Sequence, residues 1–289
     1  MKNSLLKLYA LLPLKRELFS IVRLFYVPGP AVFRHLYFKG IFKVSIDHQH
    51  SFLMNHYGSG FAMESDHFWK GVGACENYSI ELWMKYAKKS DLILDIGSNT
   101  GTYSLIAASL NSTAEIHAFE PVKRIFDKLA FNNKINNFNI HLHNVALSDI
   151  DGTIYLVEEG GKNEYTAHVS KEFVENAYSI KSLRLDTLSD LFSGDKMVLM
   201  KLDVERHEAE VLLGMGDLFR QVRPVILLEV LDHESALLLN PFFENLDYVF
   251  FNIDEINGYS LIRGIQKSYG NNIFCCPTEK ISFGNINLN

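Results

Sequence analysis

The sequence predicts an α/β fold in which a largely parallel sheet lies between two layers of helices. From about residue 91, short and continuous apolar runs alternate with longer stretches of helical spacing. Strands that are buried on both faces have such continuous runs, and their alternation with helices is typical of parallel sheets. Acidic residues follow several of the runs, at the edge where ligands bind in open α/β folds.

The individual elements follow from the same pattern. We expect strands at residues 92–96, 116–119, 140–147, 198–202, 225–230 and 248–253. We expect helices at residues 103–110, 125–134, 208–218 and 235–246, where apolar side chains recur at helical intervals. Two further short strands are expected at 153–158 and 182–186, on either side of a polar insertion. The insertion opens at residues 160–162 and is long enough to act as a lid or substrate loop.

The first 75 residues do not follow this alternation. They contain one or two basic helical segments, a Pro-Gly-Pro break at residues 28–30, and strand patterns at 41–46 and 51–55. We therefore divide the 289 residues into an N-terminal basic extension or cap, 1–75, and an α/β domain, 76–289.

Charge is unevenly distributed along the chain. The net charge is −6, yet residues 1–40 hold seven basic residues and one acidic residue. The acidic remainder lacks the broad basic footprint of a protein that binds nucleic acid. Two interpretations of the basic front end stay open. It is either a helical cap that packs on the domain or an interfacial helix that binds anionic lipid at the inner membrane surface.

The cysteine content and the hydropathy indicate the compartment. Three cysteines, two of them adjacent, provide neither a disulfide framework nor a zinc-ligand spacing. No stretch approaches the roughly 18 uncharged apolar residues of a membrane-spanning helix. The pattern of a secretory signal peptide is also missing. We therefore expect a cytoplasmic protein, while the oligomeric state is not predicted.

A glycine-rich turn follows the first expected strand, in the segment LDIGSNTGTYS at residues 94–104. Gly97 and Gly101 permit the positive φ and the close backbone approach that such a turn needs. Asn99 stands where a dinucleotide-binding fingerprint requires glycine. Asp95, two residues before the first glycine, repels phosphates and attracts a cationic ligand. S-adenosylmethionine carries an ammonium and a sulfonium group, so the turn indicates this cofactor; an ordinary tight turn is the alternative.

Another carboxylate, Glu120, closes the second expected strand. Its distance from the glycines along the chain is that of a ribose-binding acid at the end of the second strand of a nucleotide-binding unit. Its two oxygens can accept hydrogen bonds from both ribose hydroxyls. The alternative is a strand-end acid that caps the next helix.

The strand expected at 198–202 leads into the string MKLDVERHE at residues 200–208. Lys201, Asp203, Glu205 and His207 all fall at the ligand edge, where ionisable side chains are costly to hold without a role. The alternative for Glu205 and for the nearby Glu208 is a favourable interaction with the N-terminus of the next helix.

These strings together resemble the FkbM family of S-adenosylmethionine-dependent methyltransferases. The resemblance covers roughly residues 76–277 and rests on LDIGSNTGTYS (94–104), FEP (119–121), ALSDIDG (146–152), RLDTLSDL (184–191), MKLDVERHEAEVLLG (200–214) and PVILLEV (224–230). It implies a class I methyltransferase, Rossmann-like fold with a seven-stranded sheet whose last strand is antiparallel. It also implies transfer of a methyl group to a hydroxyl on a sugar, a polysaccharide or a secondary metabolite.

The resemblance also implies roles for particular residues. The cofactor turn would consist of Asp95, Gly97, Asn99, Gly101 and Tyr103. Glu120 would hold the ribose, the backbone of Ala146 and Leu147 would meet the adenine edge, and Asp203 would lie near the methionine part or the acceptor. The family usually has glycine where this chain has Arg206. This arginine either strains a positive-φ turn or points into the cleft toward an anionic substrate.

Methyl transfer to a hydroxyl requires alignment, exclusion of water and a group that takes the proton. His207 is the first candidate base, because histidine titrates near neutral pH. Asp203 is the second candidate, and Glu205 and Glu208 are the third. Lys201 either lowers the pKa of the acceptor or pairs with Asp203. We expect no metal, since no second Asp/Asn pair accompanies Asp203 at a suitable spacing.

Two other functions are considered. A methyltransferase that acts on RNA or protein usually carries an Asn/Asp-Pro-Pro-Tyr/Phe string or a catalytic cysteine, and neither lies within the motifs above. A binding module that keeps the cofactor pocket without catalysis is the second alternative, and Arg206 is the feature that favours it.

Overall fold

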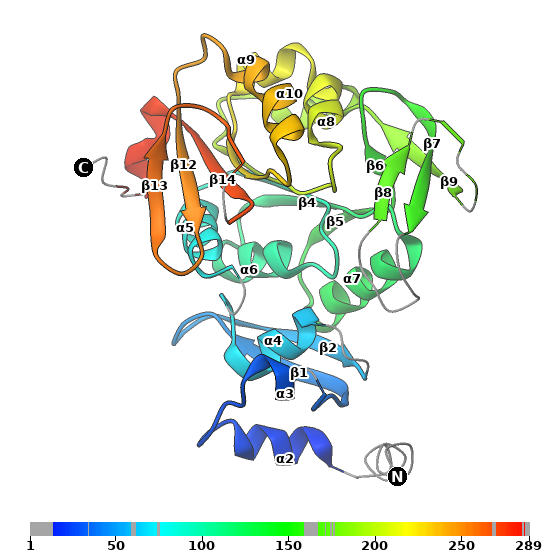
Figure 1. Ribbon diagram of the computed structural model, residues 1–289, viewed down its shortest axis with the longest axis vertical. Coiled ribbons are helices and arrows are strands. Elements are labelled where there is room, and N and C mark those ends of the chain that lie inside the picture. Colours follow the sequence, from blue (N-terminus) through cyan, green and yellow to red (C-terminus); the bar gives the residue numbers. More distant parts are fainter. Residues whose placement is uncertain are drawn as a thin grey trace.

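The computed structural model describes residues 14–33, 35–58, 62–73, 76–158, 167–170, 172–173, 175, 177–267, 270–284 and 286. Residues 160–162, at the start of the expected insertion, and residues 1–13 of the basic front end lie outside this part of the chain, as does Cys75. Figure 1 shows an α/β body with a smaller sheet at one side and the N-terminal elements at its lower end.

The body is built on an eight-stranded sheet with the spatial order β13-β12-β14-β11-β10-β3-β4-β5. Its strands are β3 (Leu92–Ile96), β4 (Glu115–Phe119), β5 (Ile140–His143), β10 (Val198–Leu202), β11 (Val225–Glu229), β12 (Tyr248–Asp254), β13 (Gly258–Ile262) and β14 (Asn272–Pro277). Strands β5, β4, β3, β10 and β11 are mutually parallel. The last strand, β14, is antiparallel to both of its neighbours, β11 and β12.

This topology confirms the predicted Rossmann-like class I methyltransferase fold, with one addition. Without β13, the sheet has seven strands, and the last of them in the chain is antiparallel, as expected. The eighth strand forms a hairpin with β12 at the outer side of the sheet. The strand order reverses between β3 and β10, which are paired although more than one hundred residues separate them in the chain. A ligand crevice is expected at such a switch point.

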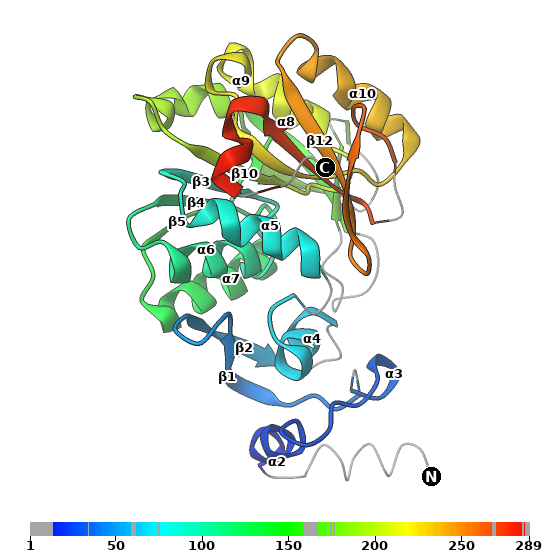
Figure 2. The same ribbon diagram turned by 90° about the vertical axis from the view of Figure 1, so that its left-hand side faces the viewer.

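Helices cover both faces of the sheet (Figures 1 and 2). On one face lie α5 (Asn77–Ala87), α6 (Thr102–Leu110) and α7 (Lys123–Asn136); on the other lie α8 (Glu208–Met215), α9 (Asp217–Val222) and α10 (His233–Phe243). Strand β3 illustrates why its sequence is continuously apolar. Ile93 packs into one buried cluster, and Leu92 and Leu94 pack into the other, so the strand has no exposed face.

The predicted helix at 208–218 is divided into α8 and α9 at Gly216, which has a φ of +54°. Within α8, Gly214 allows a close approach to the neighbouring segment. A Cβ at this position would lie 1.9 Å from the carbonyl oxygen of Ser148. The glycine of the VLLG string is therefore required by packing between α8 and the end of β6.

A second sheet of four strands flanks the body, in the order β6-β9-β7-β8. Its strands are β6 (Ala146–Leu147), β7 (Gly152–Glu158), β8 (Ala167–Ser170) and β9 (Tyr178–Leu183). The extra strand predicted at 153–158 is confirmed as β7. The single strand expected at 140–147 is wrong, because β5 pairs with β4 in the main sheet while β6 pairs with β9 in the second sheet. The short strand expected at 182–186 ends at Leu183 and continues as the 3-10 helix η1 (Leu185–Phe192).

The N-terminal segment comprises α2 (Lys15–Val22), α3 (Pro30–Phe33), the hairpin of β1 (Lys39–Ser45) and β2 (Ser51–Tyr57), and α4 (Ala62–Lys70). Side chains of α7 join the hairpin to the body. Asn136 Oδ1 accepts a hydrogen bond from the Leu53 amide at 2.6 Å, and Asn132 Oδ1 accepts one from the Asn55 amide at 3.1 Å. At the other end of the chain, η2 (Thr278–Gly284) follows β14. Among the described helices, none combines the length and apolar character needed to cross a bilayer.

Candidate active site

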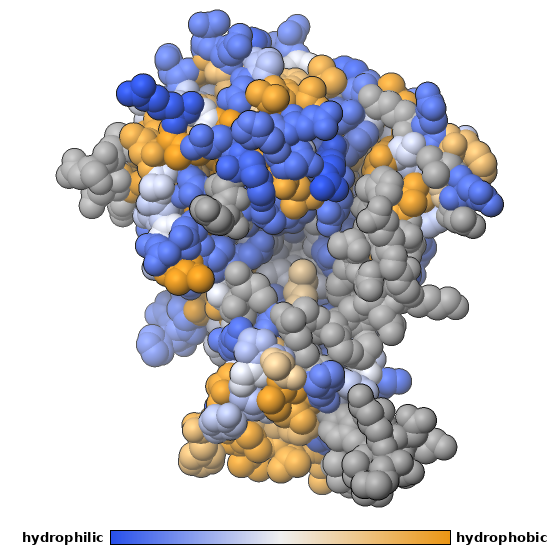
Figure 3. Space-filling model, viewed as in Figure 1, coloured by the Kyte–Doolittle hydropathy of each residue, from blue (hydrophilic) through white to orange (hydrophobic). Residues whose placement is uncertain are grey.

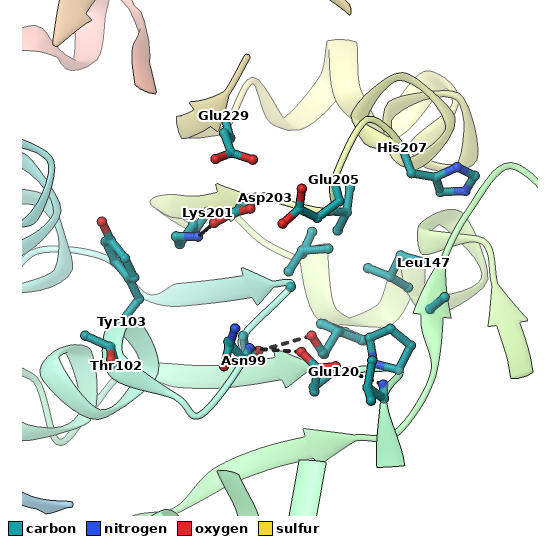
Figure 4. Close-up of a pocket in the computed structure, with 18 of the residues that line it drawn as sticks. Asn99, Thr102, Tyr103, Glu120, Leu147, Lys201, Asp203, Glu205, His207 and Glu229 are labelled. Atoms are coloured by element: carbon teal, nitrogen blue, oxygen red, sulfur yellow. Dashed lines mark hydrogen bonds and ion pairs between the residues drawn. The ribbon is translucent and has the colours of Figure 1, made fainter. Parts of the chain in front are cut away.

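A cavity of about 410 Å³ lies beyond the carboxyl ends of β3, β4, β10 and β11, where the strand order reverses. Figure 4 shows its polar and charged side chains approaching from opposite sides, with Lys201, Asp203 and Glu229 above and Asn99 and Glu120 below. The volume falls in the range of small-molecule and cofactor sites. All predicted site residues except Asp95, Gly101 and the candidate base Glu208 line it.

The glycine turn after β3 lies against the end of β4. Gly97 has a φ of +80°, and its amide donates to the carbonyl of Phe119 at 3.0 Å. Gly101 has a φ of +96° and precedes α6. The predicted positive-φ turn is thus present. Gly101 lies behind the cavity wall, where an added Cβ would contact Leu129.

Asp95 does not reach the cavity. It is buried, and its Oδ2 accepts the Ser104 amide hydrogen bond at 2.9 Å in the first turn of α6. Burial raises the pKa of this carboxyl above its ordinary value, and the nearby Lys201 ammonium opposes the rise. The sequence analysis expected this acid to face a cationic ligand. The structure instead places it behind the turn, where it holds the start of α6.

Glu120 lines the cavity at the end of β4 and is buried. Its two oxygens accept hydrogen bonds from the backbone amides of Asn99 at 3.0 Å and Val122 at 2.8 Å. Burial raises the pKa of Glu120 to about 7. Asn99, with a φ of +51°, also lines the cavity, and its buried Oδ1 has no hydrogen-bond partner among the described residues. A ligand with hydroxyl or amino donors would satisfy this oxygen.

Lys201 and Asp203 form an ion pair at the end of β10. Burial alone would lower the pKa of Lys201, but the carboxylates of Asp203, Glu76 and Asp95 together outweigh it and raise the pKa above the ordinary value. For Asp203, burial would raise the pKa, and Lys201 holds it below the ordinary value. Glu229, at the end of β11, shares a hydrogen bond with Asp203. Burial and the Asp203 charge raise the pKa of Glu229 well above the usual range, so Glu229 is the protonated partner.

The Lys201 ammonium also lies 4.8 Å from the ring centroid of Tyr103. The Tyr103 hydroxyl donates to Glu76 Oε2 at 2.7 Å, and the Asn272 amide donates to Glu76 Oε1 at 3.1 Å. Glu76 lines the cavity and was not identified from the sequence, because it lies outside every motif and one residue before α5. No local signal distinguishes it from a surface acid.

The connection after β10 contains two consecutive non-glycine residues with positive φ, Glu205 at +57° and Arg206 at +73°. The expected strained turn at Arg206 is therefore present. Arg206 does not line the cavity. It is exposed, and its Nε lies 2.6 Å from Oδ2 of Asp232, the residue that caps α10. Glu205 does line the cavity, and Figure 4 shows it beside Asp203.

His207 precedes α8 and borders the cavity at its far side. Figure 4 shows its ring on the opposite side from Lys201, directed away from Asp203. Its Nε2 lies 2.9 Å from the Ser148 hydroxyl, and its Nδ1 lies 3.6 Å from Glu210. Glu208 lies outside the lining and accepts the Val204 amide hydrogen bond at 3.0 Å. Glu208 thus performs the helix-end role that the sequence analysis left open for it.

The remaining walls come from three parts of the chain. Ala146 and Leu147 of β6 lie in the lining, as predicted, and Leu156 and Val169 of the second sheet extend this apolar wall. The N-terminal segment adds Met63, Asp66 and His67 from α4. His67 is buried, with Nε2 3.0 Å from the Thr102 hydroxyl. Sequence reasoning missed this contribution because nothing in the α4 sequence marks contact with a turn some 35 residues away.

The comparison with protein families decides the assignment. The sequence pattern of the methyltransferase FkbM domain matches residues 95–250. The chain belongs to the FkbM methyltransferase family. The matched segment begins at the glycine turn and includes Glu120, the Lys201–Asp203 pair and Glu229.

Two curated proteins are similar to parts of this chain. The hexuronic acid methyltransferase AglP of Haloferax volcanii is 32% identical over 148 residues, which are 51% of this chain and 59% of AglP. The AMB antimetabolite synthetase AmbE of Pseudomonas aeruginosa is 27% identical over 173 residues, or 47% of this chain and 8% of AmbE. This chain therefore spans less than two thirds of either relative.

Among solved structures, the methyltransferase FkbM from Methylobacillus flagellatus KT aligns with a TM-score of 0.42 and 14% identity. The alignment covers 66% of this chain and 47% of that one.

Proposed function

We propose that this chain is an S-adenosylmethionine-dependent O-methyltransferase whose acceptor is a hydroxyl group of a sugar. The observation that carries the proposal is the cavity at the β3–β10 switch point. There the glycine turn, Glu120 and the Lys201–Asp203–Glu229 cluster of an FkbM family member meet. The similarity to a hexuronic acid methyltransferase supports a sugar as the acceptor.

The residues present fit the cofactor. Glu120 offers two carboxylate oxygens to a diol such as ribose, and the unpartnered Asn99 Oδ1 beside it offers a third acceptor. Ala146, Leu147 and Leu156 provide an apolar surface for an aromatic base. Several carboxylates line the same cavity, among them Glu76 and Asp203, which favours a ligand with positive charge. The bound cofactor supplies an activated methyl group on a sulfonium.

The protein's part in the reaction is positioning, exclusion of water and removal of a proton. The α4 segment and the second sheet form walls on either side of the cavity and limit the access of water. We propose Asp203 as the group that accepts the hydroxyl proton, since its carboxylate lines the cavity and is kept ionised by Lys201. Glu205 and His207, which also line the cavity, are the other candidates.

Two measurements test the proposal. Isothermal titration calorimetry with S-adenosylmethionine should show one binding site, and Glu120→Ala should weaken binding at least about tenfold. A radiolabelled methyl-transfer assay with hexuronic acids, neutral hexoses and amino sugars should find a methylated sugar. Binding without transfer to any acceptor would favour the catalytically silent module. Methyl transfer to RNA or protein, with none to sugars, would favour a methyltransferase that acts on those acceptors. Lack of S-adenosylmethionine binding would exclude all three functions.

We also propose that α2 places the protein on an anionic membrane surface. Leu14, Leu18, Ile21 and Phe25 recur at helical intervals and are between 51% and 86% exposed, while Phe19 on the opposite side is buried. Figure 3 shows the apolar surface at this lower end of the molecule. Lys15, Arg16 and Arg23 belong to the same segment, and basic residues beside an apolar stripe are typical of interfacial helices.

Vesicle flotation tests this second proposal. The protein should float with phosphatidylglycerol vesicles more than with phosphatidylcholine vesicles. The triple variant Leu18→Ser, Ile21→Ser, Phe25→Ser should lose flotation. A matched control, Leu237→Ser with Leu238→Ser, removes two exposed leucines from α10 and should leave it unchanged. Equal flotation of the triple variant and the wild type would refute the proposal. In this arrangement residues 1–75 act as a cap and membrane contact for the domain at 76–289, in the cytoplasm.

A further inference from the structure

Three histidines and a glutamate gather on one face of the main sheet, outside the cavity. Glu115 and His117 are two residues apart on β4, and His141 and His143 are two residues apart on β5. The strands are parallel neighbours, with His117 directly opposite His141. Because side chains two residues apart point to the same face of a strand, all four meet on one surface.

The ligand atoms of Glu115, His117 and His141 lie within 4.8 Å of one another. The ring centroids of His117 and His141 are 4.6 Å apart. Two imidazoles and a carboxylate are a donor set for Zn²⁺ and related divalent transition metals, and three protein ligands leave one position for water. We infer that Glu115, His117 and His141 form a binding site for a divalent transition metal such as Zn²⁺.

Neighbouring groups hold these side chains as the outer partners of metal ligands do. His117 Nδ1 lies 2.9 Å from His143 Nε2, and His117 Nε2 lies 3.2 Å from Glu115 Oε1. When His117 donates its Nδ1 proton to His143, its Nε2 lone pair faces the Glu115 carboxylate, and a cation between them satisfies both. The Lys196 ammonium binds the other oxygen of Glu115 at 3.1 Å and fixes the carboxylate.

Metal binding requires the His141 side chain to change its orientation. Donor atoms around tetrahedral zinc are about 3.3–3.5 Å apart, given zinc–ligand distances of about 2.0–2.2 Å. His117 is buried and fixed by its two hydrogen-bond partners, whereas His141 is exposed. The His117 and His141 rings are stacked at an interplanar angle of 16°, so the exposed His141 ring must rotate to direct a nitrogen lone pair at the ion and complete the site. The metal would join the outer strand β5 to β4, the strand that leads into Glu120.

Metal titration of the tag-free, EDTA-treated protein tests the inference. Calorimetry with ZnCl₂ should show one equivalent bound, and Co²⁺ should produce the visible absorption of tetrahedral coordination. His141→Gln, at an exposed position, should fold normally and lower the Zn²⁺ affinity more than about 100-fold. Lys196→Met, which removes an outer partner, should lower it by about 10- to 100-fold.

The control variant is His233→Gln, which removes an exposed histidine from α10 and should leave Zn²⁺ binding unchanged. Zn²⁺ should also raise the melting temperature of the wild type but not of His141→Gln. Two outcomes would overturn the inference: absence of stoichiometric binding, or equal Zn²⁺ affinity in the wild type and in His141→Gln. None of these readouts depends on the methyltransferase assignment.

Discussion

The carbonyl oxygen of Asp203 lies 1.8 Å from the position that a Cβ on Gly97 would occupy. Gly97, the first glycine of the turn, is therefore required by the segment that follows β10, whatever ligand the turn holds. Gly97 also has a φ of +80°, which side chains other than glycine rarely adopt. The close approach brings the glycine turn and the Lys201–Asp203 pair into one site.

Gly97→Ala should consequently be strongly destabilising. Gly194 is a matched control, because its φ is +83° and an added Cβ there meets open space. Gly194→Ala should lower the free energy of unfolding only by the cost of a side chain at positive φ, about 1–2 kcal/mol. Gly97→Ala adds a backbone clash and should cost at least about 2 kcal/mol more. Urea unfolding of both variants measures the difference, and equal losses would show that the Asp203 segment moves aside freely.

Cofactor binding should depend on pH through Glu120. Burial raises the pKa of Glu120 to about 7, so the carboxylate that we propose as the acceptor of ribose hydroxyls is the minor form below that pH. Affinity for S-adenosylmethionine should rise as pH increases through about 7, and at pH 6 it should be about tenfold below the plateau. Glu120→Gln should bind more weakly and remove this pH dependence.

The matched control for Glu120 is Glu208→Gln. The pKa of Glu208 is also raised to about 7 by burial, but Glu208 does not line the cavity. Calorimetry between about pH 5.5 and 8.5 spans the pKa of about 7. Over this range, the affinity of Glu208→Gln for S-adenosylmethionine should depend on pH as that of the wild type does. If Glu208→Gln loses the pH dependence of cofactor affinity and Glu120→Gln keeps it, the dependence belongs to Glu208 at the start of α8.

Glu120 and Glu208 should change the free energy of unfolding with pH in the same direction. Their pKa values are raised in the folded state, so folding favours the protonated forms. The stabilisation is fully present below the unfolded pKa, about 4.5, and is lost as pH rises through about 7. The free energy of unfolding should therefore contain a falling component between pH 4.5 and 7. Urea titrations of the wild type and Glu120→Gln should show a smaller decrease in the variant.

The identity of the base can be decided by two variants. Asp203→Asn should lower kcat by about 10²- to 10⁴-fold, because it removes a proton acceptor from the cavity. It should also lower the melting temperature, because it leaves the buried Lys201 ammonium without its nearest carboxylate. His207→Gln should lower kcat less than about tenfold, since the ring contacts Ser148 and faces away from Asp203. Rates under saturating cofactor and acceptor measure both. If His207→Gln lowers kcat more than Asp203→Asn does, His207 is the base, as the sequence first suggests.

Arg206 provides a prediction about stability. Its φ of +73° costs about 1–2 kcal/mol, whereas its exposed ion pair with Asp232 contributes about 1 kcal/mol or less. Arg206→Gly, which restores the residue usual in the family, should therefore leave stability unchanged or raise it by up to about 1 kcal/mol. Cofactor affinity should stay the same, because Arg206 lies outside the cavity lining. A melting temperature well below the wild type would show that the ion pair outweighs the strain.

Much of the fold was predictable from local patterns. The continuous apolar runs identified β3, β4, β10, β11 and β12, since a strand buried on both faces has little freedom in composition. The run at 140–147 was misread as one strand because only two residues separate β5 from β6, and only the pairing partners distinguish the two strands. The hairpin strand β13 is partly exposed and carries no such signal.

The sequence by itself determined the α/β class, the antiparallel last strand implied by the family resemblance, and most residues at the strand ends. These features depend on residues close together in the chain. Only the tertiary structure decided which side chains face the cavity. It turned Asp95 toward α6, turned His207 toward Ser148, and added Glu76 and His67 from segments without a motif. The physical reason is that a strand end fixes where a residue stands, whereas the direction of its side chain depends on hydrogen-bond partners supplied by distant segments.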